Sequence, residues 1–143
     1  MEKKNTNLIG SVTELKCITY FVELGYVVSV PQCTCRYDFI IDTGDKLLKI
    51  QVKTCNTTRH PGGITFNTCS AHYVNGEHTH TSYKDDNIDY FCTYHNNECY
   101  LVPVCECGSR EKCLQLSPVK HGQTKNIAFA KDYIASDILS KLN

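Results

Sequence analysis

The chain has 143 residues, of which 41% are hydrophobic and 21% are charged, and its formal net charge is zero. These values are typical of a globular chain with one core, and they predict a single domain over residues 1–143. No apolar run reaches the roughly 18 residues that a membrane helix needs. Because the net charge is zero, any nucleic acid would have to bind to a local basic patch.

The first predicted element is a helix from residue 7 to about residue 24, with Thr6 as its N-cap and Gly25 as its stop. Glu14 lies near the edge of its apolar stripe. The VVSVP segment that follows predicts a short strand that ends at Pro31. The stripe itself consists of apolar residues at helical spacing: Ile9, Val12, Ile18, Phe21 and Val22.

Two apolar segments, 37–43 and 46–54, flank Gly44-Asp45 and predict an antiparallel hairpin with a two-residue loop. A loop over 56–63 and another strand over 64–68 come next. Residues 71–87 are polar, rich in histidine and without periodicity, so we expect a long surface loop or flexible flap there.

The last third of the chain predicts a second hairpin, a short edge strand and a closing helix. The hairpin consists of residues 88–94 and 98–104 around Asn96-Asn97. The edge strand is expected at 114–116 and the helix at 132–142. This order of elements predicts an α/β domain with a mixed sheet.

Ten cysteines are many for a chain of this length. The opening MEKKNTN is followed by no apolar signal core, so we expect the cytoplasm or another reducing intracellular compartment, with thiols packed as small hydrophobes. Two C-x-C pairs, Cys33 with Cys35 and Cys105 with Cys107, leave bound zinc as the alternative. Its ligands would be spaced C-x5-C-x-C-x5-C, unlike the C-x2-C knuckle of structural zinc sites: Cys99, Cys105, Cys107 and Cys113.

The register of the first predicted hairpin brings three polar side chains together. If Thr43 pairs with Lys46 across the loop, Asp38 faces Gln51, and directly paired residues share one face of a sheet. Side chains alternate with a period of two, so Lys53 points to the same face. An unpaired carboxylate among apolar strand residues is costly, so Asp38 needs a partner.

Two interpretations of this cluster stay open from spacing alone. The first is a structural ion pair between Asp38 and Lys53. The second is a site for a hard cation, in which Asp38 supplies a carboxylate oxygen and Gln51 an amide oxygen, as suits Mg²⁺. Lys53 would then orient or deprotonate a water, or stabilise charge on a transferring phosphoryl group.

The ordered set Glu14, Gly25-Tyr26, Pro31, Tyr37-Asp38 and Ile50-Gln51-Val52-Lys53-Thr54 resembles the PD-(D/E)XK nuclease superfamily. The likeness is to its group I intron homing endonucleases, whose last motif is also Q-x-K. It extends from about residue 8 to residue 134, through four further segments in matching order: FNTCS at 66–70, IDYF at 88–91, YLVP at 100–103 and AKDY at 130–133.

The resemblance implies a restriction-endonuclease-like mixed sheet flanked by helices, and hydrolysis of double-stranded DNA that depends on Mg²⁺, with Mn²⁺ as a substitute. It implies that Asp38, Gln51 and Glu14 hold the metal and that Lys53 is the catalytic lysine. Gln51 stands where the family usually has a second acid, so metal affinity depends more on Asp38 and Glu14. Pro31 stands seven residues before Asp38, so the literal Pro-Asp pair is missing.

Several further residues are candidates for DNA contact, and each has a structural alternative. For Arg59 and His60, the alternative is an ordinary solvated loop. For the hydroxyls of Thr54 and Ser70, the alternative is a hydrogen bond to the backbone. For His72, His78 and His80 a DNA-contacting flap is favoured over a metal site, because H-x-H in a flexible loop lacks preorganisation. The candidates for DNA contact are Thr54, Arg59, His60, Ser70 and Lys84.

Two other functions compete with a homing-type endonuclease: a structure-selective nuclease such as a Holliday junction resolvase, and a catalytically relict DNA-binding protein. Retention of Glu14, Asp38 and Lys53 together argues against a relict, and Q-x-K favours the homing type. The resemblance also implies a homo-oligomer, a dimer or a tetramer. Contacts between copies are expected at the second hairpin or the closing helix: Ile134, Ile138 and Leu139.

Overall fold

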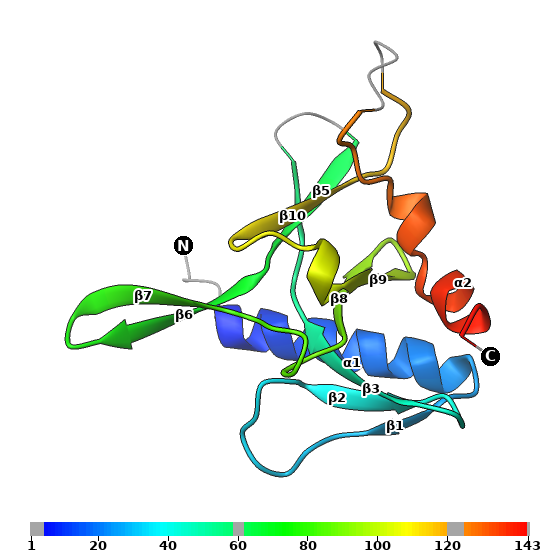
Figure 1. Ribbon diagram of the computed structural model, residues 1–143, viewed down its shortest axis with the longest axis horizontal. Helices are drawn as coiled ribbons and strands as arrows, with labels where there is room; N and C mark the ends of the chain where they lie inside the picture. The colour runs from blue at the N-terminus through cyan, green and yellow to red at the C-terminus, as the bar shows by residue number, and fades with distance from the viewer. Residues whose placement is uncertain (1–4, 59–61, 120–124, 143) are drawn as a thin grey trace.

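The computed structural model describes residues 5–58, 62–119 and 125–142, and its centre is a five-stranded sheet in the order β1-β2-β3-β8-β9 (Figure 1). β3 and β8 run parallel, and the other neighbouring strands run antiparallel. The expected mixed sheet of an α/β fold is therefore confirmed. Its strands are β1 Val27–Ser29, β2 Phe39–Asp42, β3 Leu47–Val52, β8 Tyr90–His95 and β9 Glu98–Pro103.

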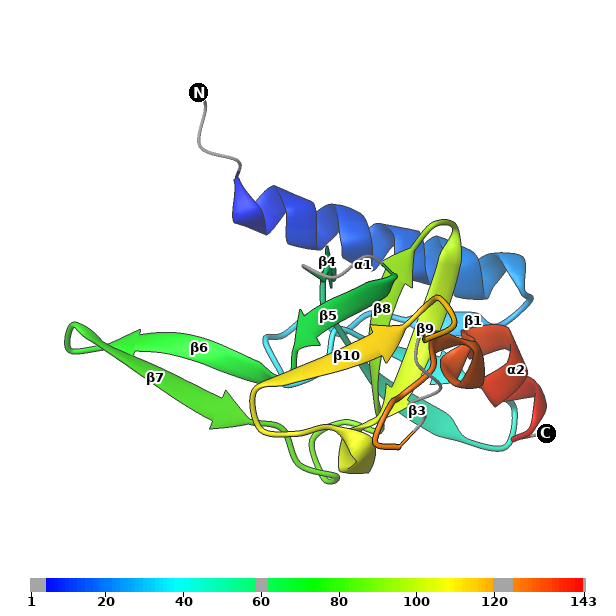
Figure 2. The ribbon, with the colours of Figure 1, turned by 90° about the horizontal axis from the view of Figure 1, so that it is seen from above.

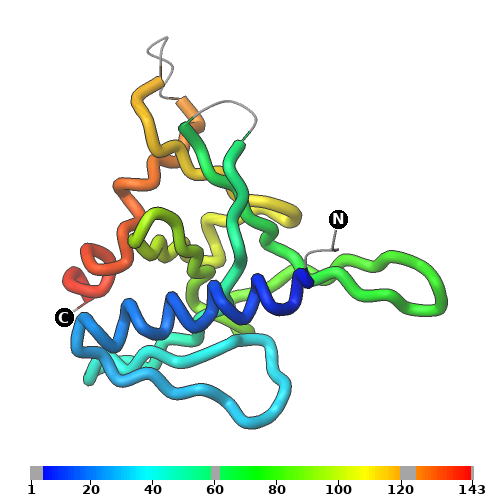
Figure 3. Tube along the Cα trace, turned by 180° about the vertical axis from the view of Figure 1, so that it is seen from behind, coloured from blue at the N-terminus to red at the C-terminus, as the bar shows by residue number. Residues whose placement is uncertain are grey.

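Helix α1, Thr6–Glu23, lies across one face of this sheet, as the view from behind makes clear (Figure 3). Its N-cap is Asn5, not Thr6, because the Asn5 side chain accepts a hydrogen bond from the backbone N–H of Asn7 at 3.1 Å. Gly25 follows the helix with a φ of +91°, a conformation that suits glycine.

The buried face of α1 differs from the predicted apolar stripe. Thr13, Cys17 and Phe21, spaced four residues apart, face the sheet. Val12 and Val22 are instead more than half exposed. Apolar side chains occur on both sides of this helix, so its periodicity could not decide which side the sheet would cover.

A second layer covers the opposite face of the central sheet. It is the three-stranded sheet β10-β5-β4, and alternate residues of β8 and β9 face the two layers. Cys92 and Leu101 pack with α1 in one core, whereas Phe91 and Val102 pack with the second layer in the other. The strands of this layer are β4 Asn56–Thr57, β5 Gly63–Asn67 and β10 Glu111–Gln115.

The closing helix is shorter than predicted. A 3₁₀ turn η2, Ala130–Tyr133, precedes helix α2, Ala135–Ser140. Leu139 is fully buried against the α1 side of the sheet, so it is not available for a contact between copies, because it seals that core. A further 3₁₀ turn η1, Val104–Glu106, follows β9. In the part of the chain that the structure describes, no helix is long and apolar enough to cross a membrane.

The prediction of a loop is wrong over 71–82, because strands β6, Cys69–Val74, and β7, Glu77–Ser82, form a hairpin that stands out from the body (Figures 1 and 2). Residues 83–87 lie outside any helix or strand, as predicted. Asn75 and Gly76 turn it, with φ values of +51° and +82°. Asn-Gly is a strong hairpin signal, but the flanking strands carry no apolar alternation that would mark them as strands.

Candidate active site

The β2–β3 hairpin has the register that the sequence predicted, and Asp38 lies directly before its last paired residue, Phe39. Phe39 pairs with Ile50, and the Asp38 N–H continues the ladder by donating to Ile50 O at 2.8 Å. Val52 N–H donates to Asp38 Oδ2 at 2.6 Å, so the carboxylate takes the place of a backbone acceptor where the two strands end. The position of this carboxylate is therefore set by the sheet itself.

The four predicted catalytic residues line one cleft of about 410 Å³. Asp38, Gln51 and Lys53 come from the end of the hairpin, and Glu14 comes from the middle of α1. The first two turns of the helix form the opposite wall. The helix and the hairpin are far apart in the sequence, so only packing brings the Glu14 carboxylate to the cleft.

Burial raises the pKa of both carboxylates in the cleft, those of Asp38 and Glu14. The pKa of Asp38 is raised mainly by burial, against the opposing effects of the Val52 N–H and the Lys53 ammonium. The pKa of Glu14 is raised by burial and then by the charge of Asp38. Two poorly hydrated carboxylates that face one cleft would gain from a cation between them. The donor set fits a hard divalent ion, since carboxylate and amide oxygens are the ligands that Mg²⁺ prefers.

Lys53 is held by the base of the β6–β7 hairpin. Its Nζ donates to Cys69 O at 3.2 Å and to Tyr83 Oη at 3.5 Å, and it lies 5.0 Å from the centre of the Tyr83 ring. Among the described residues, no carboxylate oxygen lies within 4.0 Å of this ammonium, so the structural ion pair with Asp38 is not formed. Burial lowers the pKa of Lys53, while the more distant Asp38 raises it.

Two hydrogen bonds orient the remaining groups of the cleft. Gln51 Nε2 donates to Val52 O at 3.2 Å, which fixes the plane of the amide. Thr54 Oγ1 lies 2.9 Å from Thr13 Oγ1 and joins the end of the hairpin to the helix residue before Glu14. The Thr54 hydroxyl therefore has a structural partner, whereas its exposed side also borders the cleft.

The other predicted DNA contacts lie in different places. Ser70 accepts a hydrogen bond from Arg36 Nη1 at 2.9 Å and borders a second groove beside the cleft. Lys84 is exposed and borders neither the cleft nor this groove. Arg59 and His60 lie outside the described residues.

Two arginines outside the predicted set of site residues lie beside the cleft. Arg36 stacks on Tyr83, with its guanidinium 3.9 Å from the ring centre, and Arg110 borders the second groove together with Lys53. Arg36 stands two residues before Asp38, and this proximity was the available signal. Arg110 comes from a distant loop, so no signal in the sequence pointed to it.

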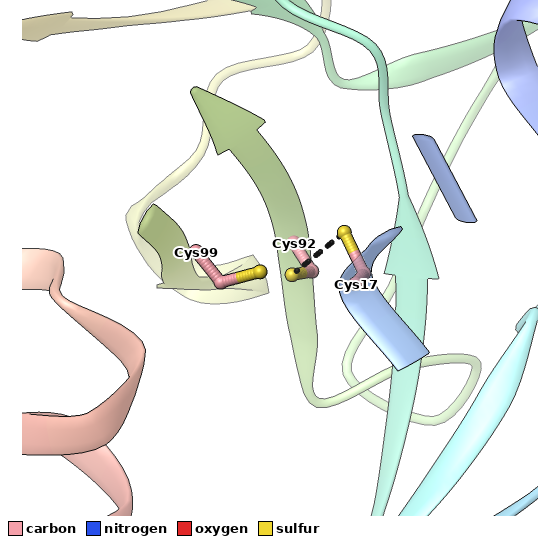
Figure 4. A group of neighbouring side chains, drawn as sticks. All are labelled: Cys17, Cys92 and Cys99. Atoms are coloured by element: carbon pink, nitrogen blue, oxygen red, sulfur yellow. Dashed lines mark hydrogen bonds between the residues drawn. The ribbon is translucent and has the colours of Figure 1, made fainter. Parts of the chain in front are cut away.

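Three cysteines converge on one point in the core (Figure 4). Cys17 of α1, Cys92 of β8 and Cys99 of β9 are fully buried, their sulfurs lie within 4.8 Å of one another, and Cys92 Sγ donates to Cys17 Sγ at 3.6 Å. Cys99 therefore packs here and not with the exposed Cys105 and Cys113. Within the described ranges, the four-cysteine zinc set does not come together.

Packing of the three cysteines holds the helix turn that carries Glu14 against the sheet. Cys17 follows Glu14 by three residues, so the two side chains lie on neighbouring positions of one helix face. Burial between α1 and two strands gives the thiols a packing role, as expected of small apolar side chains.

Comparison with known proteins adds a family and a fold. A family model described as PD-(D/E)XK endonuclease matches residues 4–136. Among solved structures, the chain is similar to a bacterial homing endonuclease, I-Ssp6803I, with a TM-score of 0.74 and 21% sequence identity over 96% of this chain and 95% of that one. The chain matches no curated protein.

Proposed function

The chain belongs to the PD-(D/E)XK endonuclease family, and from this premise we propose that it is a Mg²⁺-dependent, sequence-specific endonuclease of the homing type that cuts double-stranded DNA. The observation that carries the proposal is the convergence of Glu14, Asp38, Gln51 and Lys53 on one cleft. The similarity of the fold to a homing endonuclease supports the finer assignment.

Three oxygen donors would hold the cation: the carboxylates of Asp38 and Glu14 and the amide oxygen of Gln51. Mg²⁺ prefers such ligands, and Mn²⁺ is a suitable substitute. When bound, the ion would neutralise charge on the scissile phosphate and lower the pKa of a water. Because Gln51 is neutral, the charge that attracts the ion comes from Asp38 and Glu14.

Lys53 would stabilise the charge that develops on the phosphate in the transition state. Its ammonium is held by neutral groups, Cys69 O and Tyr83 Oη, and no tight ion pair neutralises it among the described residues. A fixed positive charge in a partly buried cleft acts strongly on a nearby oxyanion, because little water screens it and the group is already in place.

A symmetric dimer or tetramer would place two such clefts on the two strands of a duplex. Cutting both strands at one site needs two active sites, and one module of this size covers little DNA. One set of exposed apolar side chains that could serve for contact between copies lies on the outer face of α1. Leu8, Val12 and Leu15 are 64%, 51% and 63% exposed.

The direct test is cleavage of a random-sequence duplex library and of a four-way junction, each with and without Mg²⁺. We expect Mg²⁺-dependent cutting of the duplex at one preferred sequence, and Asp38→Asn serves as the inactive control against contaminating nuclease. Cutting confined to the junction, whatever its sequence, would assign a resolvase. A folded protein that cuts neither substrate with Mg²⁺ or Mn²⁺ would refute the proposal and favour a relict.

A further inference from the structure

Beyond its base, the β6–β7 hairpin has no packing role in the body of the protein. Every residue from Ala71 to Ser82 is exposed, and the two strands stand away from the three layers (Figure 2). Six residues per strand correspond to a length of about 20 Å. A protruding ribbon that buries nothing within its own chain is available for another molecule.

The base of the hairpin is bound to the residues of the candidate active site. Lys53 Nζ donates to Cys69 O in β6 at 3.2 Å. One guanidinium holds both strands, since Arg36 donates to Ser70 Oγ at 2.9 Å and to Ser82 O at 3.1 Å. The direction in which the hairpin points is therefore set by the same groups that position the lysine.

One face of the hairpin continues into the groove beside the cleft. The register pairs Ala71 with His80 and Tyr73 with His78, so these four side chains share a face. Ala71 and His80 border a groove of about 770 Å³ together with Lys53, Thr54 and Arg110. A molecule bound in the cleft can thus extend along this face without a break.

The aromatic rings on this face form an ordered row. The centres of the Tyr73 and His78 rings are 4.1 Å apart, and His78 stacks on His80 at 6.2 Å with an interplanar angle of 15°. His80 is further placed by Cys69, whose Sγ lies 3.6 Å from His80 Nδ1. The row presents ring nitrogens and a phenol hydroxyl that can donate and accept hydrogen bonds.

The charges suit base recognition more than phosphate binding. Residues 69–82 contain no lysine or arginine and one glutamate, Glu77. The cations that would contact phosphates, Arg36, Lys53 and Arg110, lie at the base of the hairpin. Phosphate contacts position a protein on DNA, whereas hydrogen bonds to base edges select a sequence. A two-stranded ribbon fits the major groove, which is about 12 Å wide.

We propose that the β6–β7 hairpin enters the major groove of the DNA next to the bond that is cut, and that its Tyr73–His78–His80 face reads the bases there. This inference rests on the proposed function, because it takes duplex DNA in the cleft as given. The opposite face, which carries Thr79, points away from the bases.

The test is a binding selection from a random-sequence duplex library in EDTA, which does not depend on cleavage. The intact protein is compared with the double variant His78→Ala/His80→Ala and with Thr79→Val, a matched control from the same strand and the opposite face. We expect the double variant to show no base preference over one contiguous block, where discrimination should fall about 5- to 150-fold for each hydrogen-bonded base pair that is no longer read. We expect Thr79→Val to keep the full preference.

The salt dependence of binding separates base reading from phosphate binding. Removal of a phosphate interaction would reduce the slope of log affinity against log salt by about 1, whereas removal of a hydrogen bond to a base leaves this slope unchanged. We therefore expect the same slope for the double variant and the intact protein. A reduced slope would overturn the proposal and assign the hairpin to the DNA backbone.

Other results would overturn the proposal in distinguishable ways. An unchanged base preference in the folded double variant would show that the hairpin does not read sequence, and a changed oligomeric mass would make it a contact between copies. If the double variant does not fold, Tyr73→Leu is put through the same selection. An intact protein that cuts duplex DNA at one preferred sequence, with that preference kept by the double variant, would refute the inference alone, whereas one that neither binds nor cuts DNA would refute the proposed function as well.

Discussion

Val52 donates its backbone N–H to Oδ2 of Asp38 at 2.6 Å, so a side-chain carboxylate completes the hydrogen-bond ladder of the β2–β3 hairpin. Val52 lies between Gln51 and Lys53 in the sequence, and the carboxylate is therefore tied to the backbone of the strand that carries both. An uncharged acceptor of the same shape can keep this bond. Structure and charge can thus be separated by substitution at position 38.

Asp38→Asn is expected to melt at a higher temperature than the intact protein in metal-free buffer at neutral pH, and to cut no DNA. Burial raises the pKa of Asp38, so the folded state disfavours its charged form. The destabilisation of the folded state by the charged carboxylate is absent below the pKa of Asp38 in the unfolded chain, and it grows as the pH rises through the higher pKa in the folded protein. The stability gain of Asp38→Asn should therefore disappear in acid. Thermal melts at neutral and acidic pH measure it.

The same variant tests the cation site without an activity assay. A ligand present at about 100 times its Kd stabilises the folded state by about 2.7 kcal/mol, which raises the melting temperature of a domain this size by about 5–10 °C. We expect Mg²⁺ or Mn²⁺ to stabilise the intact protein in this way and to leave Asp38→Asn unchanged. Equal stabilisation of both proteins would contradict the assignment of Asp38 as a ligand.

Lys53→Met is expected to bind DNA and to melt near the temperature of the intact protein, yet to cut about a hundredfold to a thousandfold more slowly. Methionine retains much of the apolar stem and removes the charge. The matched control is Lys49→Met, from β3 four residues before Lys53, because Lys49 does not border the cleft and its substitution should leave the rate unchanged. Normal cutting by Lys53→Met would return this lysine to a structural role.

Gln51→Glu is expected to lower the Mg²⁺ concentration needed for half-maximal cutting. The substitution adds a third carboxylate to Asp38 and Glu14, and a hard cation binds more tightly to a more negative set of oxygens. The same charge should destabilise the metal-free protein, because like charges in one partly buried cleft repel. A Mg²⁺ titration of the cutting rate, with melts in EDTA, measures both effects. A higher Mg²⁺ requirement would argue against position 51 as a ligand.

The protein is expected to fold and cut after treatment with a chelator followed by Mg²⁺ alone. The buried trio Cys17, Cys92 and Cys99 packs as core, and within the described ranges no fourth ligand joins it. Elemental analysis after dialysis and a melt before and after chelation provide the check. Stoichiometric zinc that survives dialysis, with unfolding once it is removed, would make the trio a metal site.

Light scattering at micromolar protein is expected to give the mass of a dimer or a tetramer. Substitution of Leu15 on the exposed face of α1 by glutamate should reduce that mass, because a charge replaces an apolar contact. Leu47→Glu, at an exposed position on β3, is the comparison. A monomer both with and without DNA would contradict the predicted assembly.

Much of the hairpin part of the candidate active site could be predicted from the sequence, because it depends on local backbone geometry. The two-residue loop at Gly44-Asp45 and the period-two alternation of strands fix the register in which Phe39 pairs with Ile50, and the structure has that register, with Asp38 and Gln51 together at the end of the hairpin. The same alternation placed Lys53 beside them. The order of motifs resembled the PD-(D/E)XK superfamily, and the family match confirms that resemblance.

Only the tertiary structure decided how separate elements meet. Which face of α1 is buried, and hence that Glu14 reaches the cleft, follows from packing of Thr13, Cys17 and Phe21 on the sheet. The partners of Lys53 come from the β6–β7 hairpin, whose exposed polar strands carry no apolar pattern. The register of a hairpin depends on residues that are close in the sequence. The contacts between α1, the sheet and the β6–β7 hairpin depend instead on which apolar surfaces are removed from water together, and this is decided only when the whole chain folds.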